Sequence, residues 1–134
     1  AVAVSLVGKH ENNFKTAAIV AAQFIERLKE HPLPADQIIN LNVPDLSIED
    51  IKGIKVTRLG HRHKAETMKM SKDPWQRKIY WYGALGAELD AGEGTDFHAV
   101  SQGYASVTPL TVDMTAYKSM QTMTEWVSEF NLRE

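Results

Sequence analysis

A loop bracketed by Gly94 and Gly103 carries polar side chains of the kinds that contact ligands. Thr95, Asp96 and His98 lie close together in it. Their hydroxyl, carboxylate and imidazole groups could face a ligand or a neighbouring chain, because binding residues are often carried on loops. The alternative is a capped hairpin in which Asp96 hydrogen-bonds its own backbone. Residue types alone favour this alternative, since Asx turns are common in such loops.

Two histidines at alternate positions form a second candidate for chemistry. His61 and His63 would lie on one face of an extended segment, and with a carboxylate such as Asp96 they could hold a transition metal. Other cations crowd residues 58–64 and would oppose a metal ion. We therefore interpret the segment as a basic, solvated turn and predict no metal ligands in this chain.

Positive charge is concentrated in the middle of the chain. Of the fifteen lysines and arginines, nine lie between residues 52 and 78, where Glu66 and Asp73 offset them. Such a patch attracts phosphate-bearing ligands, and neighbouring aromatic side chains could stack a base. Charged hairpins also serve simply as solvated edges that prevent aggregation, so both interpretations stay open. The nine cations are Lys52, Lys55, Arg58, Arg62, Lys64, Lys69, Lys72, Arg77 and Lys78.

The chain has no motif of a self-contained enzyme. It lacks the G-x-S-x-G nucleophile elbow and both standard phosphate-binding glycine loops. Asp90, Glu93 and Asp96 could pair for acid–base work, but acidic loops of this kind more often serve solubility.

The elements that would position these residues begin with a βαβ unit. Residues 1–7 are apolar or small on both faces, which is typical of a buried parallel strand. A helix is predicted from Asn12 or Asn13 to about His31, followed by a strand over 38–43; such units are right-handed. The predicted apolar stripe of the helix consists of Phe14, Ala18, Ala21, Ile25 and Leu28.

Residues 54–110 are predicted to form long antiparallel hairpins, part of which project from the body. Strands are expected at 54–59, 79–82 and 104–110. A projecting hairpin would expose the aromatic side chains of Trp75, Tyr80, Trp81 and Tyr82. Such an apolar surface usually marks a subunit interface.

A final amphipathic helix is predicted, capped by Asp113 or Thr115. Because it follows an extended linker, it could pack on its own body or be exchanged with a neighbouring subunit. Its predicted stripe is Ala116, Met120, Met123, Val127 and Phe130, flanked by Trp126.

Length and composition limit the number of domains, the kinds of partner and the compartment. With 134 residues and 43% apolar content, the chain is one domain at most, which we divide into residues 1–44, 45–112 and 113–134. A net charge of −2 gives no general drive towards nucleic acid or membrane. The absence of cysteines fits a reducing compartment, and we predict a cytoplasmic protein. The opening strand has no polar lead-in, so we expect further chain before residue 1.

Three blocks of sequence carry a resemblance to the survival-protein SurE family of metal-dependent 5′-nucleotidases. They are Leu-Asn-Val-Pro at 41–44, Gly-Ile-Lys-Val-Thr-Arg-x-Gly at 53–60, and Gly-Thr-Asp-Phe-x-Ala-Val-x-x-Gly-Tyr-x-Ser-Val-Thr-Pro-Leu at 94–110. The resemblance extends over essentially the whole chain. It departs from the family pattern at Trp75-Gln76, where Arg-Gly is common, and at Tyr117, where a histidine is often seen.

The resemblance implies the C-terminal part of a SurE-like, Rossmann-type three-layer α/β fold. The family's metal- and phosphate-binding motifs are absent here, so the resemblance assigns no catalytic residue to this chain. It implies a divalent cation, Mg or Mn, bound by an N-terminal half outside this sequence. It also implies nucleoside monophosphate substrates and a homodimer or homotetramer formed through the hairpin and the last helix. Thr95, Asp96 and Arg58 become candidates for the substrate rim. The alternative is a non-catalytic oligomerisation or nucleotide-binding module.

Overall fold

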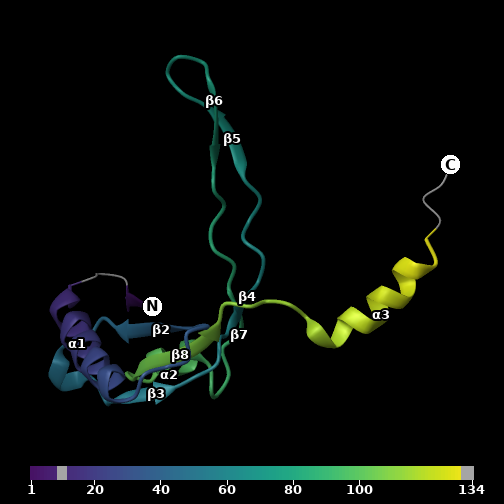
Figure 1. Ribbon diagram of the computed structural model, residues 1–134. Helices are drawn as coiled ribbons and strands as arrows, with labels where there is room; N and C mark the ends of the chain where they lie inside the picture. The colour runs from purple at the N-terminus through teal and green to yellow at the C-terminus, as the bar shows by residue number, and fades with distance from the viewer. Residues whose placement is uncertain (9–11, 131–134) are drawn as a thin grey trace.

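The computed structural model describes residues 1–8 and 12–130 and shows a mixed four-stranded sheet with a helix on each face (Figure 1). The strand order is β1-β2-β8-β3. β1 runs parallel to β2, β2 antiparallel to β8, and β8 parallel to β3. The strands are β1 (Val2–Val7), β2 (Gln37–Pro44), β8 (Ala105–Thr111) and β3 (Ile54–Val56).

Helix α1 (Phe14–Glu30) connects β1 to β2 and covers one face of the sheet. Ala17 and Val20 of this helix are buried against the inward-facing residues of β2 and β8. Small side chains at the contact let the helix axis approach the sheet closely. The buried strand residues are Ile39, Leu41, Val43, Ala105 and Val107.

The predicted stripe of this helix is only partly correct: Ala21 packs against the core and Leu28 is half-buried, but other members of the stripe face outward. Phe14 and Ile25 are 61% and 42% exposed, and Ala18 also faces outward. The helix is apolar over more than half its circumference, so two neighbouring stripes both satisfy the three- and four-residue spacing. Packing against the sheet selects the stripe that contains Ala17, Val20, Ala21 and Phe24.

β1 forms an edge of the sheet in this chain. The carbonyls of Ala1 and Val7 accept from the amides of Ile39 and Asp45 in or just after β2. The other side of β1 pairs with no strand among the described residues. Val4 and Val7 are each 43% exposed, so the burial expected for residues 1–7 is not found within this chain.

The second face of the sheet is polar and is partly covered by α2 (Asp96–Ser101). Because β2 alternates, Asn40 and Asn42 point to this face while Leu41 points towards α1. Thr57 and Thr108, both buried, share a hydrogen bond of 2.8 Å between their hydroxyls. With one helix on each face, the arrangement has the three layers expected from the sequence.

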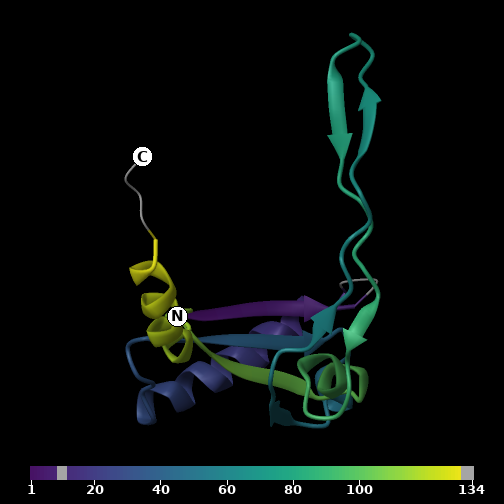
Figure 2. The ribbon, with the colours of Figure 1, turned by 90° about the vertical axis from the view of Figure 1, so that its right-hand side faces the viewer.

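The prediction of hairpins throughout 54–110 is only partly correct. β3 and β8 belong to the central sheet, so the hairpin is confined to the segment between them. It contains two ladders, and it stands away from the sheet in both views (Figures 1 and 2). The ladders are β4 (His61–Arg62) with β7 (Glu88–Asp90) and β5 (Lys69–Lys72) with β6 (Lys78–Trp81).

The hairpin exposes the aromatic side chains predicted for it. Trp75, Tyr80, Trp81 and Tyr82 are between 61% and 91% exposed. At the tip, the carboxylate of Asp73 accepts hydrogen bonds from the backbone amides of Trp75 and Arg77, both at 2.9 Å. The tip is therefore an ordered turn that presents an indole ring to solvent.

The last helix, α3 (Tyr117–Ser128), leads away from the body (Figure 1). None of its residues is buried. Neither Asp113 nor Thr115 caps it: the N-cap is Ala116, and Asp113 instead accepts hydrogen bonds from the Thr115 amide and the Tyr117 hydroxyl. Hydrogen bonds from the Thr115 side chain, the Tyr117 hydroxyl and the Thr115 amide, in that order of effect, lower the pKa of Asp113 to about 2.

A short 3-10 helix, η1 (Ile48–Asp50), follows β2. No described helix combines the length and the apolar character that crossing a bilayer requires.

The central position of Leu41 gives a stability prediction. Leu41 is fully buried between α1 and the sheet, so Leu41→Ala should lower the free energy of unfolding by about 2–5 kcal/mol. Leu89→Ala, at a 61% exposed position, should change it by less than about 0.5 kcal/mol. Urea denaturation followed by circular dichroism measures both. Equal effects of the two variants would contradict the assigned core.

Candidate functional site

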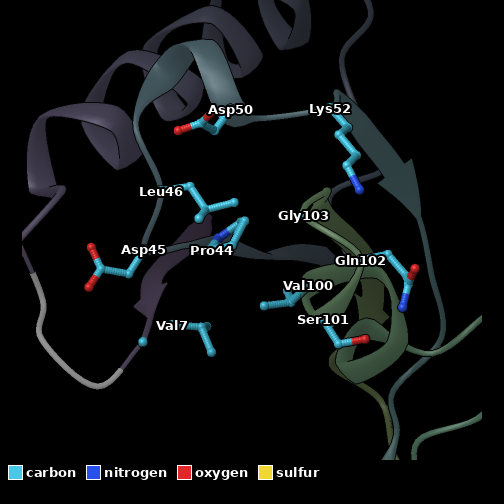
Figure 3. Close-up of a pocket in the computed structure, with 11 residues that line it drawn as sticks. Val7, Pro44, Asp45, Leu46, Asp50, Lys52, Val100, Ser101, Gln102 and Gly103 are labelled. Carbon is cyan, nitrogen blue, oxygen red and sulfur yellow. The ribbon is translucent and has the colours of Figure 1, made fainter.

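A pocket lies at the carboxyl ends of the parallel strands β1 and β2 (Figure 3). Its volume is about 630 Å³, which lies within the range of small-molecule sites. Ligands of open α/β sheets bind in crevices outside the carboxyl ends of the strands. The lining residues are Val7, Gly8, Pro44, Asp45, Leu46, Asp50, Lys52, Val100, Ser101, Gln102 and Gly103.

One wall of this pocket is formed by the close contact of Gly8 with Asp45. A β-carbon at residue 8 would lie 2.2 Å from the β-carbon of Asp45, so this position tolerates no side chain. The carboxylate of Asp45 turns away from the pocket (Figure 3) and accepts hydrogen bonds from the backbone and side-chain nitrogens of Asn13, each at 2.9 Å. Asp45 therefore anchors the start of α1.

Lys52 supplies positive charge at the opposite wall. Its backbone amide donates to the carbonyl of Gly103 at 3.0 Å, and Gly103 has φ = 83°, a conformation that favours glycine. Among the described residues, Lys52 forms no ion pair. The pocket thus combines close backbone approach with one cation available to a ligand.

The three candidate rim residues are brought together by their backbones. The amide of Arg58 donates to the carbonyl of Gly94, and the amide of Asp96 donates to the carbonyl of Arg58, both at 3.0 Å. These bonds form a parallel bridge between Arg58 and Thr95. The structure therefore joins the end of the strand segment at 54–58 to the start of α2.

The side chains of Thr95 and Asp96 are occupied within the fold. The fully buried Thr95 hydroxyl donates to Gly92 O at 2.7 Å and accepts from the His98 amide as the N-cap of α2. Asp96 Oδ1 accepts from the amides of Gly60 (2.8 Å) and Phe97 (2.9 Å). Asp96 therefore does bond local backbone, but in a helix start rather than in the predicted hairpin turn.

Arg58 is engaged by Asp90 at the base of the hairpin. Its two terminal nitrogens contact the two carboxylate oxygens, with Nη2 donating to Oδ1 at 3.1 Å. The hydrogen bonds from Arg58 lower the pKa of Asp90, against an opposing effect of desolvation. The same hydrogen bonds raise the pKa of Arg58. Both side chains stay partly exposed.

The remaining cations of the basic segment divide into two groups. Near the body, Lys55 lies over the ring of Tyr104 at 4.0 Å and Arg62 lies over the ring of Phe97 at 4.7 Å. The others line the exposed hairpin. These are Lys64, Lys69, Lys72, Arg77 and Lys78.

The two histidines do not form a metal centre with Asp96 in this structure. His61 lies opposite Asp90 in the β4–β7 ladder, while Asp96 is bonded to Gly60 and Phe97. Within residues 1–8 and 12–130, no three histidine or carboxylate side chains gather in a group that could hold a metal ion.

A second pocket, of about 400 Å³, lies on the polar face of the sheet. Sequence reasoning missed its two central amides, Asn40 and Asn42. The signal was present, since Asn40 and Asn42 alternate with apolar residues in a predicted strand. The lining residues are Val7, Asn40, Asn42, Arg62, Glu88, Asp96, Phe97, Val100 and Ser101.

The fold and the first pocket define an α/β protein of Rossmann-like type that carries a long projecting hairpin. Comparison with known proteins shows what the chain is similar to. The family model described as survival protein SurE matches residues 1–66. Together with two curated relatives, this match shows that the chain is similar to the C-terminal half of SurE-family proteins.

The two curated relatives are each called 5′-nucleotidase SurE. The protein from Aeromonas hydrophila is 58% identical over 93% of this chain and 49% of its own length. The protein from Pseudoalteromonas atlantica is 53% identical over 96% of this chain and 52% of its own length. The chain therefore spans about half the length of these relatives.

A solved structure supports the same assignment. The SurE protein from Aquifex aeolicus superposes with a TM-score of 0.74 at 38% identity. The match covers 94% of this chain and 51% of that protein. The α/β architecture is thus shared with an experimentally determined member of the family.

The ion pair at the hairpin base gives a prediction about ionisation. Arg58→Ala should raise the pKa of Asp90 towards its ordinary value, because the main cause of its depression is removed. A carboxyl group with a depressed pKa stabilises the fold above its unfolded pKa, and this contribution is lost as the pH falls through the folded pKa. Arg58→Ala should therefore weaken the acid-range dependence of stability.

Carbon-13 NMR titration of the Asp90 carboxyl group measures this shift directly. Arg27→Ala, which breaks an exposed pair with Glu30 on α1, is the matched control and should leave Asp90 unchanged. An unaltered Asp90 titration in Arg58→Ala would show that the pair does not form in solution.

Proposed function

We propose that this chain is the C-terminal part of a metal-dependent 5′-nucleotidase that hydrolyses nucleoside 5′-monophosphates to nucleoside and phosphate. The observation that carries this proposal is 53–58% identity, over nearly the whole chain, to relatives named 5′-nucleotidase SurE. Identity at this level over a continuous stretch favours a shared activity of the whole proteins.

The catalytic metal site belongs, in this proposal, to the half of the protein that this chain does not span. The described residues do not fit a metal centre, since no cluster of three suitable ligands exists among them. The open side of β1 supports the same division, because parallel sheets are normally covered on both faces and continue over several strands. No hydrolytic step is therefore assigned to a residue of this chain.

The role of this chain at the active site is to shape the cleft and to attract substrate. Lys52 places positive charge at the carboxyl edge of β1 and β2, where the carboxylates of Asp45 and Asp50 accept hydrogen bonds from Asn13 and Ser47, so Lys52 is the group that would attract a phosphate. The three rim residues act by fixing the base of the hairpin against α2. Arg58 bonds Asp90, Thr95 bonds Gly92, and Asp96 bonds Gly60.

Assembly into a homodimer or homotetramer is the second role. The projecting hairpin and α3 expose large apolar side chains, including Trp75, Trp81, Met123 and Trp126. Contiguous exposed apolar surface is unusual in monomeric proteins and marks interaction sites. Both elements stand away from the body (Figure 1), where a second copy could cover them.

If the metal site lies in the other half of the protein, the extended protein and the 134-residue chain should differ in phosphate release. The protein extended by its N-terminal half should release phosphate from nucleoside monophosphates with Mg²⁺ or Mn²⁺. The 134-residue chain alone should release none. A phosphate-release assay on both proteins measures this, with EDTA as the control for the metal. Metal-dependent turnover by the 134-residue chain would contradict the proposal, and inactivity of both would favour a non-catalytic module.

The assembly proposal is tested on α3. Replacing Met123 and Trp126 together by glutamate should lower the mass of the particle, because charges would then face the apolar contact. Thr122→Glu, on the same exposed helix, is the control and should leave the mass unchanged. Light scattering after size-exclusion chromatography measures the mass. An unchanged oligomer in the double variant would remove α3 from the interface.

A further inference from the structure

A row of hydrogen-bonding side chains crosses the polar face of the sheet. Asn42 lies opposite Ser5 of β1 on one side and opposite Ser106 of β8 on the other. Residues directly opposite each other in neighbouring strands point to the same face. Asn40 lies two residues before Asn42 in β2 and therefore points to the same face. Both asparagines line the second pocket.

This row has hydrogen-bonding capacity that the described part of the chain does not use. The Asn40 and Asn42 side chains are half-buried, and neither amide forms a hydrogen bond with a described residue. The Ser106 hydroxyl is fully buried and also lacks a partner there. A buried polar group without a partner is costly, and here one such group, the Ser106 hydroxyl, lies beside two half-buried amides whose hydrogen-bonding groups are open to the pocket. These amides are available to a polar ligand.

The charge of the surrounding wall indicates which kind of ligand fits. Glu88 and Asp96 contribute two carboxylates, against the single guanidinium of Arg62. Arg62 is already engaged, because it donates to the Gly86 carbonyl at 3.3 Å and lies over the ring of Phe97. Arg62 also pairs with Glu88 at 4.0 Å, so the wall offers no free cation to a phosphate dianion and keeps the negative charge of Asp96. A neutral group with hydroxyl and amide functions fits it better.

The second pocket adjoins the first. Val7, Val100 and Ser101 line both, so one ligand could extend from the carboxyl edge of β1 across to the polar face. Lys52 lies at the wall of the first pocket, where the Asp45 carboxylate turns away towards Asn13 and the Asp50 carboxylate accepts a hydrogen bond from the Ser47 hydroxyl. The second pocket presents the uncharged amides of Asn40 and Asn42. This arrangement suits a molecule that is anionic at one end and neutral and polar at the other.

We propose that the pocket containing Asn40 and Asn42 binds the nucleoside end of the substrate, with the two amides hydrogen-bonding the sugar hydroxyls or the base edge. The inference rests on the proposed function, because that function supplies the nucleotide. It adds that recognition of the uncharged part of the substrate belongs to this chain, apart from the metal-dependent chemistry.

Calorimetric titration of the full-length protein with adenosine, inosine, cytidine and uridine tests the proposal without requiring turnover. At least one nucleoside should bind the unaltered protein, and Asn42→Ala and Asn40→Ala should each weaken that binding about tenfold, as expected for loss of a hydrogen bond in a pocket. Asn42→Ser serves as a milder second variant in case Asn42→Ala does not fold. Asn12→Ala, outside both pockets, is the matched control and should bind normally.

Inorganic phosphate provides the contrasting readout. Its inhibition constant against hydrolysis should be the same in both asparagine variants and in the unaltered protein, while KM for the monophosphate rises. Absence of nucleoside binding, or unchanged binding in both variants, overturns the proposal. So does a parallel loss of nucleoside and phosphate affinity together with a lower melting temperature, because that pattern indicates a structural role. If the protein binds a nucleoside through Asn42 but hydrolyses no monophosphate, the proposed function is refuted and the nucleoside pocket is supported.

Discussion

The pairing of β2 with a strand on each side is the constraint on which the rest of the structure depends. β2 lies between β1 and β8, and its alternation directs Ile39, Leu41 and Val43 into the core under α1. The same alternation directs Asn40 and Asn42 to the opposite face. One strand therefore determines both where the apolar core forms and where polar groups remain available for a ligand.

Several surfaces outside this core are not covered by the described part of the chain. β1 has an open side, α1 exposes Phe14 and Ile25, and the hairpin and α3 expose aromatic and methionine side chains. These regions differ in what is proposed to cover them. We propose that the half of the protein that this chain does not span covers the open side of β1, and that other copies cover the hairpin and α3. The first proposal is supported by the chain spanning about half the length of its curated relatives, and the second by the exposed apolar side chains.

Much of the fold was predictable because it is encoded locally. The βαβ unit, the projecting aromatic hairpin and the last helix follow from short-range patterns, and the three sequence blocks indicated the family. The pairing of β8 with β2 was not predictable, because no local signal links residues 105–111 to 37–44. α2 was missed although Thr95 before Asp96 is a typical helix start. In the site, the proximity of Arg58 to Asp96 depends on a bridge between distant segments, and the pocket at Asn42 requires the register of three strands.

The central claim is that β1 continues into a larger sheet, and hydrogen exchange in the full-length protein tests it most directly. Since the Ala1 and Val7 carbonyls bond β2 and its following residue, the amides of Val4 and Leu6 point to the open side. Residue-resolved exchange should show both amides protected to the same degree as those of β2. Exchange of Val4 and Leu6 at the rate of solvent-exposed amides would contradict the claim, because β1 would then be a true edge strand.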